Sequence, residues 1–221
     1  MPLRSIVLAT GEIYHLFNRT VGHEEIFNLK RQLNQILAIT DYYRFSQPLR
    51  YSKFKLLPMS LKTQYLEKQQ RYKPLVDIFT YSFMPNHLHF LLKQISDNGI
   101  RQFISNIQNS YARFFNLSNN RHGTLFTNSF KAKRIETDEQ FIHTSRYIHL
   151  NHVTGYLINI NELFNYPWSS FCNYVDLKKL SFVNREPILN HFGSSESYVK
   201  FVVDQVDYQR KLMLIKNLTF E

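Results

Sequence analysis

A single cysteine, Cys172, occurs among the 221 residues of this chain. An intrachain disulfide and a cysteine-rich zinc site are therefore excluded, and a reducing, cytoplasmic setting is expected. No apolar run approaches the ~20 residues that span a bilayer, so no association with a membrane is expected. The six glycines form neither a GxxxxGK loop nor a GxGxxG fingerprint, which argues against the common nucleotide-binding folds.

Acidic residues are scarce over two long stretches of the sequence. Lys and Arg outnumber Asp and Glu by 27 to 17, which gives a formal net charge of +10. No acid occurs between Asn98 and Ile135, and Glu67 is the one acid beside eight basic residues between Arg44 and Lys73. Segregated positive charge with interleaved Tyr and Phe favours a polyanionic partner, most simply nucleic acid. The alternative is a basic surface without a specific partner.

The spacing of apolar residues predicts an α+β fold. Residues 12–19 alternate as a strand does, and residues 75–83 are rich in Val, Ile, Phe and Tyr, which also favours a strand. Residues 87–93 and 129–136 are interpreted as two further strands, and helical spacing occurs in residues 24–43 and 98–117. The basic stretch 44–73 contains two prolines and is interpreted as an insertion or a flexible arm. The order strand, helix, strand, strand, helix, strand is that of the ferredoxin-like, split βαβ fold. It predicts an antiparallel sheet with helices on one face and an opposite face free for a ligand or one more helix.

That further helix is predicted directly after the fourth strand. Thr137 and Gln140 form the pattern of a capping box at its start. His143, Tyr147 and Asn151 follow at spacings of four residues, so they share one stripe along the helix. The stripe places a phenol one turn from an imidazole and one turn from an amide oxygen.

His87 and His89 are separated by one residue on a predicted strand, so their side chains are expected on the same face. Two such imidazoles can hold a divalent metal ion. If the stripe of Tyr147 meets this face, the metal would polarise a scissile phosphate and Tyr147 would attack phosphorus. Metal charge and basic side chains would favour the phenolate, because the pKa of an unperturbed tyrosine is ~10.

Each of these assignments has a structural alternative. His87 and His89 could instead be ordinary half-buried strand residues, and Tyr147 could have a packing role. Asn151 would also suit the C-terminal cap of the helix. Tyr111 is the second candidate for the nucleophile.

Four sequence blocks, taken in order, resemble the single-tyrosine HUH transposases, in particular the REP-associated tyrosine transposase group. The blocks are Met84–His89, Phe126–Lys131, Arg146–Asn151 and Tyr166–Ser170. The resemblance implies a ferredoxin-like nuclease fold and dependence on Mg²⁺ or Mn²⁺. It also implies cleavage and rejoining of single-stranded DNA beside a hairpin, through a 5′-phosphotyrosine intermediate. A prokaryotic protein associated with the nucleoid when on DNA is implied as well.

Carried over position by position, the resemblance assigns Tyr147 as the nucleophile and His87, His89 and Asn151 as metal ligands. The basic side chains expected to contact DNA phosphates are Arg19, Lys131, Lys133, Arg134 and Arg146. The sequence departs from the family at His152, where proline is usual, and no effect on the chemistry is expected. No tyrosine lies four residues from Tyr147, which argues against a two-tyrosine relaxase mechanism.

The sequence therefore predicts a DNA transposase that acts as a metal-dependent, hairpin-specific single-strand endonuclease and strand transferase. The alternative is a non-catalytic, ferredoxin-like nucleic-acid-binding module, which would tolerate the loss of Tyr147. We predict a domain of residues 1–155 and a C-terminal helical extension, residues 156–221, packed on its core. A helix in this extension is expected to be capped by Ser194 or Ser195. A monomer and a homodimer both remain open.

Overall fold

Four strands form one antiparallel sheet in the spatial order β2-β3-β1-β4. The computed structural model describes residues 7–127, 129–175, 180–208 and 210. The strands are β1 (Ile13–Arg19), β2 (Val76–Met84), β3 (His87–Gln94) and β4 (Lys131–Ile135). This order is that of the ferredoxin-like fold, so the predicted α+β class is confirmed.

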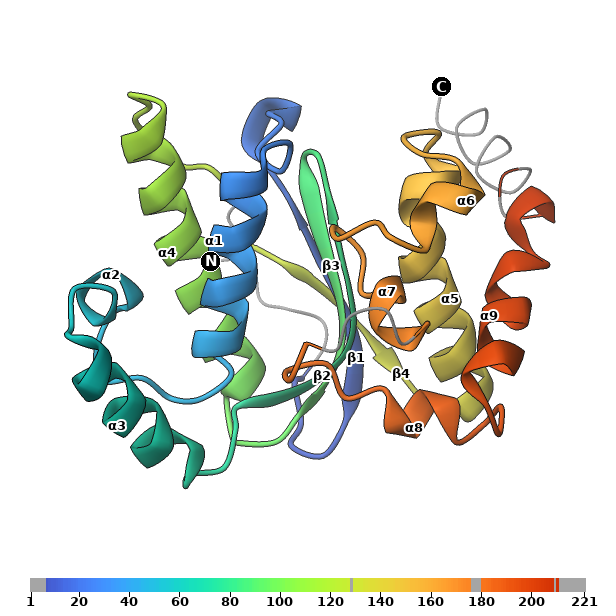
Figure 1. Ribbon diagram of the computed structural model, residues 1–221, viewed down its shortest axis with the longest axis horizontal. Helices are drawn as coiled ribbons and strands as arrows, with labels where there is room; N and C mark the ends of the chain where they lie inside the picture. Colours follow the sequence, from blue (N-terminus) through green and yellow to red (C-terminus); the bar gives the residue numbers. More distant parts are fainter. Residues whose placement is uncertain (1–6, 128, 176–179, 209, 211–221) are drawn as a thin grey trace.

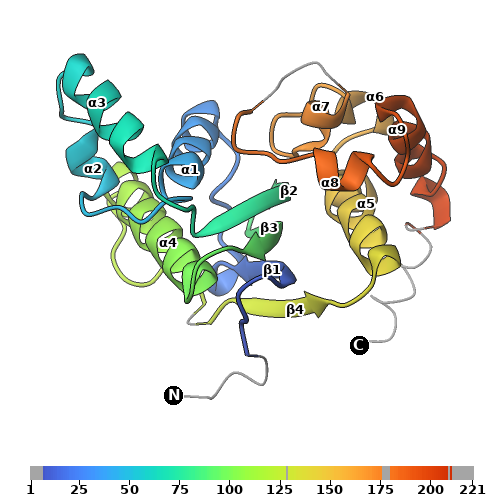
Figure 2. The ribbon, with the colours of Figure 1, turned by 90° about the horizontal axis from the view of Figure 1, so that it is seen from below.

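Helices cover both faces of the sheet (Figure 1, Figure 2). α1 (Lys30–Tyr42) and α4 (Gly99–Ser118) pack on one face over a core that includes Leu16, Phe90 and Ile104. α5 (Asp138–Thr154) packs on the other face, over a second core that includes Phe141 and Ile148. The shorter helices are α2 (Tyr51–Phe54), α3 (Met59–Gln70), α6 (Ile160–Leu163), α7 (Phe171–Tyr174), α8 (Glu186–Leu189) and α9 (Ser195–Val203).

β2 is buried on both faces and contains a bulge. Its register against β3 shifts between Ile78 and Thr80. The shift places Ile78 and Tyr81 in the core beneath α1 and α4, and Phe79 in the core beneath α5. A strand covered on both faces reads as a nearly continuous apolar run, which is why this stretch does not alternate in the sequence.

The helix expected over residues 24–43 starts later than predicted, at Lys30. The backbone amides of Ile26 and Phe27 donate hydrogen bonds of 2.7 and 3.2 Å to the carbonyl of Pro85, in the turn between β2 and β3. Both side chains are buried in the core beneath α1 and α4. Residues 24–29 have apolar residues at helical spacing, but these hydrogen bonds to the turn replace the helical turns that the spacing predicts.

The interpretation of residues 44–73 as a flexible arm is wrong, because they are folded. That they are an insertion stays a prediction. They form α2 and α3 and pack on the end of α1 through aromatic rings. The ring of Phe54 lies 4.8 Å from that of Tyr42 and 5.5 Å from that of Tyr65, measured between centroids. The Tyr42 hydroxyl also donates a hydrogen bond of 2.7 Å to the carbonyl of Leu49.

The predicted helix caps are confirmed. The Thr137 side chain accepts a hydrogen bond from the amide of Gln140 at the start of α5, and Ser194 accepts one from the amide of Ser197 at the start of α9. The Gln140 side chain reaches back to the amide of Glu136, one residue before the cap. α9 contributes to the same core as α5, and the boundary at residue 155 stays a prediction. None of the described helices is long and apolar enough to cross a membrane.

Candidate active site

β3 presents His87 and His89 on the face of the sheet that α5 covers. The centroids of the two imidazole rings are 5.0 Å apart. Leu88 and Phe90 lie on the opposite face, in the core beneath α1 and α4. The prediction that the two histidines share a face is therefore confirmed, because the strand alternates as expected.

Tyr147 of α5 lies over the same face of the sheet. Its ring centroid is 6.0 Å from that of His89 and 5.8 Å from that of His15 on β1, both in edge-on contact. The residue is 38% exposed, whereas most tyrosines nearby are buried. The stripe on α5 and the strand histidines thus meet, and the phenol remains accessible to a large substrate.

Asn151 lies one helical turn beyond Tyr147 and is 4% exposed. Its amide nitrogen, Nδ2, has no hydrogen-bond partner in the described part of the chain. Because α5 continues to Thr154 and Gly155 is its C-cap, Asn151 is not the cap that was the alternative. A buried amide without a partner costs about 1–3 kcal/mol, which is unusual outside functional sites.

Hydrogen bonds hold both strand histidines through Nδ1. Nδ1 of His87 lies 2.7 Å from Oδ1 of Asn86, an acceptor, so it carries the proton and leaves Nε2 with a free lone pair. Nδ1 of His89 lies 2.9 Å from Nε2 of His15. If His89 donates in that bond, its Nε2 also keeps a free lone pair. Metal-binding histidines are commonly oriented in this way, by a hydrogen bond from the other ring nitrogen.

Sequence reasoning missed Asn86 and His15 as parts of this site. A signal for His15 was available. It alternates with Phe17 and Arg19 on β1, and the ferredoxin-like order makes β1 the neighbour of β3. The contact with His89 is visible only in the tertiary structure, because the strand register places His15 opposite Leu91 and Phe17 opposite His89.

All three imidazoles are held neutral. Burial lowers the pKa of His15 to about 4, with a smaller contribution from the charge of Lys133. Burial also lowers the pKa of His87 to about 4, assisted by Arg19 and His23, and it lowers the pKa of His89 well below its usual range. At neutral pH these side chains therefore keep the lone pairs that a metal requires.

The pKa of the Tyr147 phenol is shifted in the direction opposite to the expected one. Burial raises its pKa above the ordinary value, and the positive charge of Arg19 opposes this effect without overcoming it. The predicted influence of basic side chains is thus present, but desolvation of the phenolate outweighs it.

The half of this face that lies over β1 and β4 is basic. Lys131 pairs with Phe17 and Lys133 pairs with His15, so both lysines share the face of the histidines. Both lysines and Arg19 are exposed, while Phe17 is half-buried. This basic face, formed by Arg19, Lys131 and Lys133, continues from Tyr147 over the sheet.

Two predicted DNA-contacting arginines lie elsewhere. Arg134 occupies the alternate position on β4, and its guanidinium forms a 2.8 Å ion pair with Glu12. Arg146 is 8% exposed, and its guanidinium lies 4.2 Å from the ring centroid of Phe201. Burial lowers the pKa of Arg146. Neither placement favours a phosphate contact. Arg134 is already paired with a carboxylate, and Arg146 lies on the side of α5 that contacts α9.

Tyr111, the second candidate nucleophile, lies on α4, is fully buried and donates a hydrogen bond to the carbonyl of Ile26. It lies in the core opposite the histidines, which excludes it as the nucleophile of this site. His152 is also buried. Its Nε2 lies 3.1 Å from the carbonyl oxygen of Phe83 on β2, so it anchors α5 to the sheet.

The donors at this site are of mixed type. Among the described residues, no group of three or more His, Cys, Asp or Glu side chains is arranged to hold a metal ion. The side chains that offer free donor atoms are the two strand imidazoles and the carboxamide of Asn151. Amide oxygen suits Mg²⁺ or Mn²⁺ and imidazole suits transition metals, so this mixed set is compatible with a divalent cation.

The fold and the site define a class of protein: a ferredoxin-like sheet with two strand histidines beneath a tyrosine-bearing helix. Residues 53–151, which include His87, His89, Tyr147 and Asn151, match the family model described as IS200-like transposase. This match supports the resemblance seen in the sequence blocks, so the predicted similarity to the single-tyrosine transposases is confirmed.

A solved structure shows the same fold. The chain is similar to a REP-associated tyrosine transposase bound to a REP hairpin, at 12% identity and a TM-score of 0.57. The match covers 84% of this chain and 98% of that chain. A candidate transposase from Deinococcus radiodurans R1 matches 67% of this chain and 95% of its own, at 14% identity and a TM-score of 0.36. The curated proteins contain no match to this sequence.

Proposed function

We propose that this protein cleaves and rejoins single-stranded DNA by transesterification, with Tyr147 as the nucleophile. The observation that carries the proposal is the position of Tyr147, accessible to solvent and 6.0 Å from the ring of His89. The basic face beside it suits a phosphodiester backbone. The REP hairpin bound by the structural neighbour supports a DNA hairpin as the substrate class.

His87, His89 and Asn151 fit a divalent cation, Mg²⁺ or Mn²⁺. The support is the two neutral imidazoles held through Nδ1 and the buried carboxamide of Asn151, whose two ends exchange by a flip and of which one end has no partner. In this proposal each imidazole binds through Nε2 and Asn151 through its amide oxygen. The bound cation would polarise the scissile phosphate and offset the charge that develops on it.

Tyr147 carries the covalent step. Its Oη forms a bond to phosphorus while the bond from phosphorus to the 3′ oxygen breaks. The phenolic proton passes to solvent, and the leaving 3′ oxygen takes up a proton. The products are a 5′-phosphotyrosine and a free 3′-hydroxyl. Rejoining reverses the step: a 3′-hydroxyl attacks the phosphotyrosine, and Tyr147 is the leaving group.

Arg19 has two roles in this scheme. Its charge opposes the effect of burial on the pKa of Tyr147, so it favours the phenolate that attacks. It is also exposed on the basic face, where it can contact a phosphate near the scissile bond. Lys131 and Lys133 extend that contact along the strand.

The test uses labelled hairpin DNA from the repeats that flank the native gene, incubated with Mn²⁺ and resolved on a denaturing gel. Wild type is expected to retain the label covalently, while Tyr147→Phe and an EDTA-treated sample retain none. Tyr156→Phe is the matched control, because Tyr156 is an exposed tyrosine just beyond α5. A label retained by Tyr147→Phe would refute the assignment of the nucleophile. Equal binding without any adduct in either protein would favour the non-catalytic binding module.

A further inference from the structure

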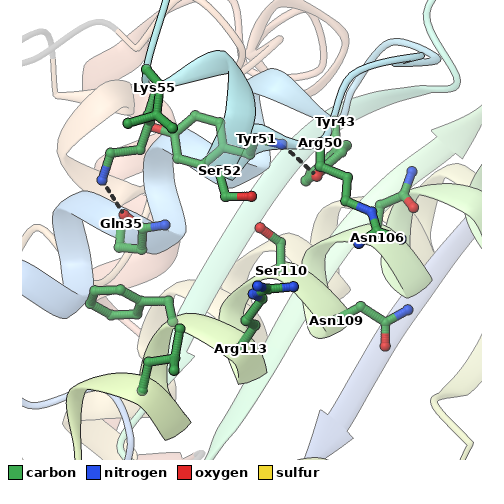
Figure 3. Close-up of a pocket in the computed structure, with 13 residues that line it drawn as sticks. Gln35, Tyr43, Arg50, Tyr51, Ser52, Lys55, Asn106, Asn109, Ser110 and Arg113 are labelled. Carbon is green, nitrogen blue, oxygen red and sulfur yellow. Dashed lines mark hydrogen bonds between the residues drawn. The ribbon is translucent and has the colours of Figure 1, made fainter.

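A cavity of about 690 Å³ lies between α1, α2 and α4 (Figure 3). These helices stand on the face of the sheet opposite α5, so the cavity is separated from Tyr147 by the sheet (Figure 1). The stretch 44–73, which has no role in the proposed chemistry, supplies one wall of it. The cavity therefore belongs to a different surface from the candidate active site.

The wall of the cavity is positively charged. Arg50 precedes α2, Lys55 follows it, and Arg113 comes from α4. No Asp or Glu occurs among the described residues that line it. Lys55 lies over the ring of Tyr51, 5.9 Å from its centroid. Three cations without a carboxylate around one hollow favour an anionic ligand.

Side chains that can recognise a base lie between these cations. Gln35, Asn106, Asn109 and Ser110 also line the cavity (Figure 3). Carboxamides offer both donors and acceptors, as the edge of an unpaired base requires. The ring of Tyr51 adds an aromatic surface on which a base can stack.

We propose that this cavity is a second contact site for single-stranded DNA, which holds phosphates at its cations and an unpaired base among its amides. The inference rests on the proposed function, since it assumes a DNA substrate. A double helix has its base edges paired and cannot insert them into a hollow of this size. The proposal also gives the stretch 44–73 a role, because this stretch carries eight basic residues and one acid.

The experiment measures fluorescence anisotropy of a labelled dT30 strand in EDTA, so that cleavage does not contribute. Ser52→Glu places a carboxylate in the cavity wall, and Ser60→Glu makes the same change at the start of α3, outside it. Both serines are exposed, so folding is preserved. Ser52→Glu is expected to weaken binding about tenfold, while Ser60→Glu stays within about twofold of wild type.

A second pair of variants tests the cations directly. Arg50→Gln combined with Arg113→Gln removes two lining charges, and Lys62→Gln combined with Arg101→Gln removes two charges that do not line the cavity. Loss of two phosphate contacts reduces the slope of log K against log salt by about 1.4 for a single strand. The first pair is expected to show this change and the control pair is not.

Three results would overturn the inference. Equal losses in test and control variants would mean a general effect of charge. An equal loss for a 30-base-pair duplex would mean a site for double helix, and displacement of dT30 by millimolar inorganic phosphate would mean a site for the free anion. The gel assay of Tyr147 separates this inference from the proposed function. Absence of an adduct in wild type would refute the proposed nuclease function alone. Unchanged binding of dT30 by Ser52→Glu would refute the DNA contact at the cavity alone.

Discussion

Replacing His15 is expected to weaken metal binding without removing a proposed ligand. Nε2 of His15 lies 2.9 Å from Nδ1 of His89, and His89 is 5% exposed. Without His15, the buried Nδ1–H of His89 has no acceptor, and the proton is free to move to Nε2, the atom proposed to bind metal. A buried donor left unpaired costs about 1–3 kcal/mol. Outer partners of metal-bound histidines typically change affinity about 10–100-fold, or roughly 1.4–2.8 kcal/mol.

The assay is calorimetric titration of Mn²⁺ into the protein in the absence of DNA. His15→Phe keeps a ring beside Phe17, whose centroid lies 5.2 Å away, and removes only the hydrogen bond. It is expected to raise Kd about 10–100-fold, and His15→Gln restores part of the affinity because its amide oxygen can accept. His87→Ala abolishes binding. The control is His143→Phe on α5.

An unchanged Kd for His15→Phe, with binding still abolished by His87→Ala, would refute the orienting role. An equal rise for His143→Phe would show a general effect of removing a histidine. The stability of each variant is checked by thermal unfolding in EDTA, so that a loss of fold is not read as a loss of affinity.

Other predictions concern stability. Tyr198→Phe removes a hydroxyl that bonds His149 at 2.8 Å, and urea unfolding is expected to show a loss of about 1–2 kcal/mol that the exposed control Tyr208→Phe does not. Burial lowers the pKa of His149 to about 3, so its contribution to stability is complete above pH 6.5 and is lost as pH falls from 6.5 toward 3. Free energies of unfolding in urea at pH 7.5 and 5.0 should therefore differ by about 2 kcal/mol more in wild type than in His149→Gln. Gly99→Ala would overlap the carbonyl oxygen of Leu75 and is expected to lower the thermal midpoint by several degrees, which a midpoint within one degree of wild type would contradict.

Much of the fold follows from local patterns. β1 alternates between buried and half-buried positions, α4 carries an apolar stripe, and α5 begins at the cap that its sequence encodes. The positions of His87, His89 and Tyr147 follow from these periods. Each period fixes a direction for its side chains, and the ferredoxin-like order then brings the strand and the helix together.

Long-range contacts explain where the structure differs from the sequence-based predictions. The start of α1 moved to Lys30 because the chain before it pairs with the turn at Pro85. Arg146 fits a DNA contact by charge alone, but α9 places Phe201 beneath its guanidinium. No pattern within α5 predicts a contact with Phe201, which lies 55 residues further along the chain.

By itself, the sequence determined the element order, the shared face of the two histidines and the stripe that carries Tyr147. These are properties of short segments, because backbone geometry assigns each side chain a direction within its own strand or helix. The tertiary structure decided that His15 supports His89, that Tyr111 is buried, and that the basic stretch 44–73 closes a cavity with α4. Each of these depends on strand register and packing between distant segments, which are set by the whole core.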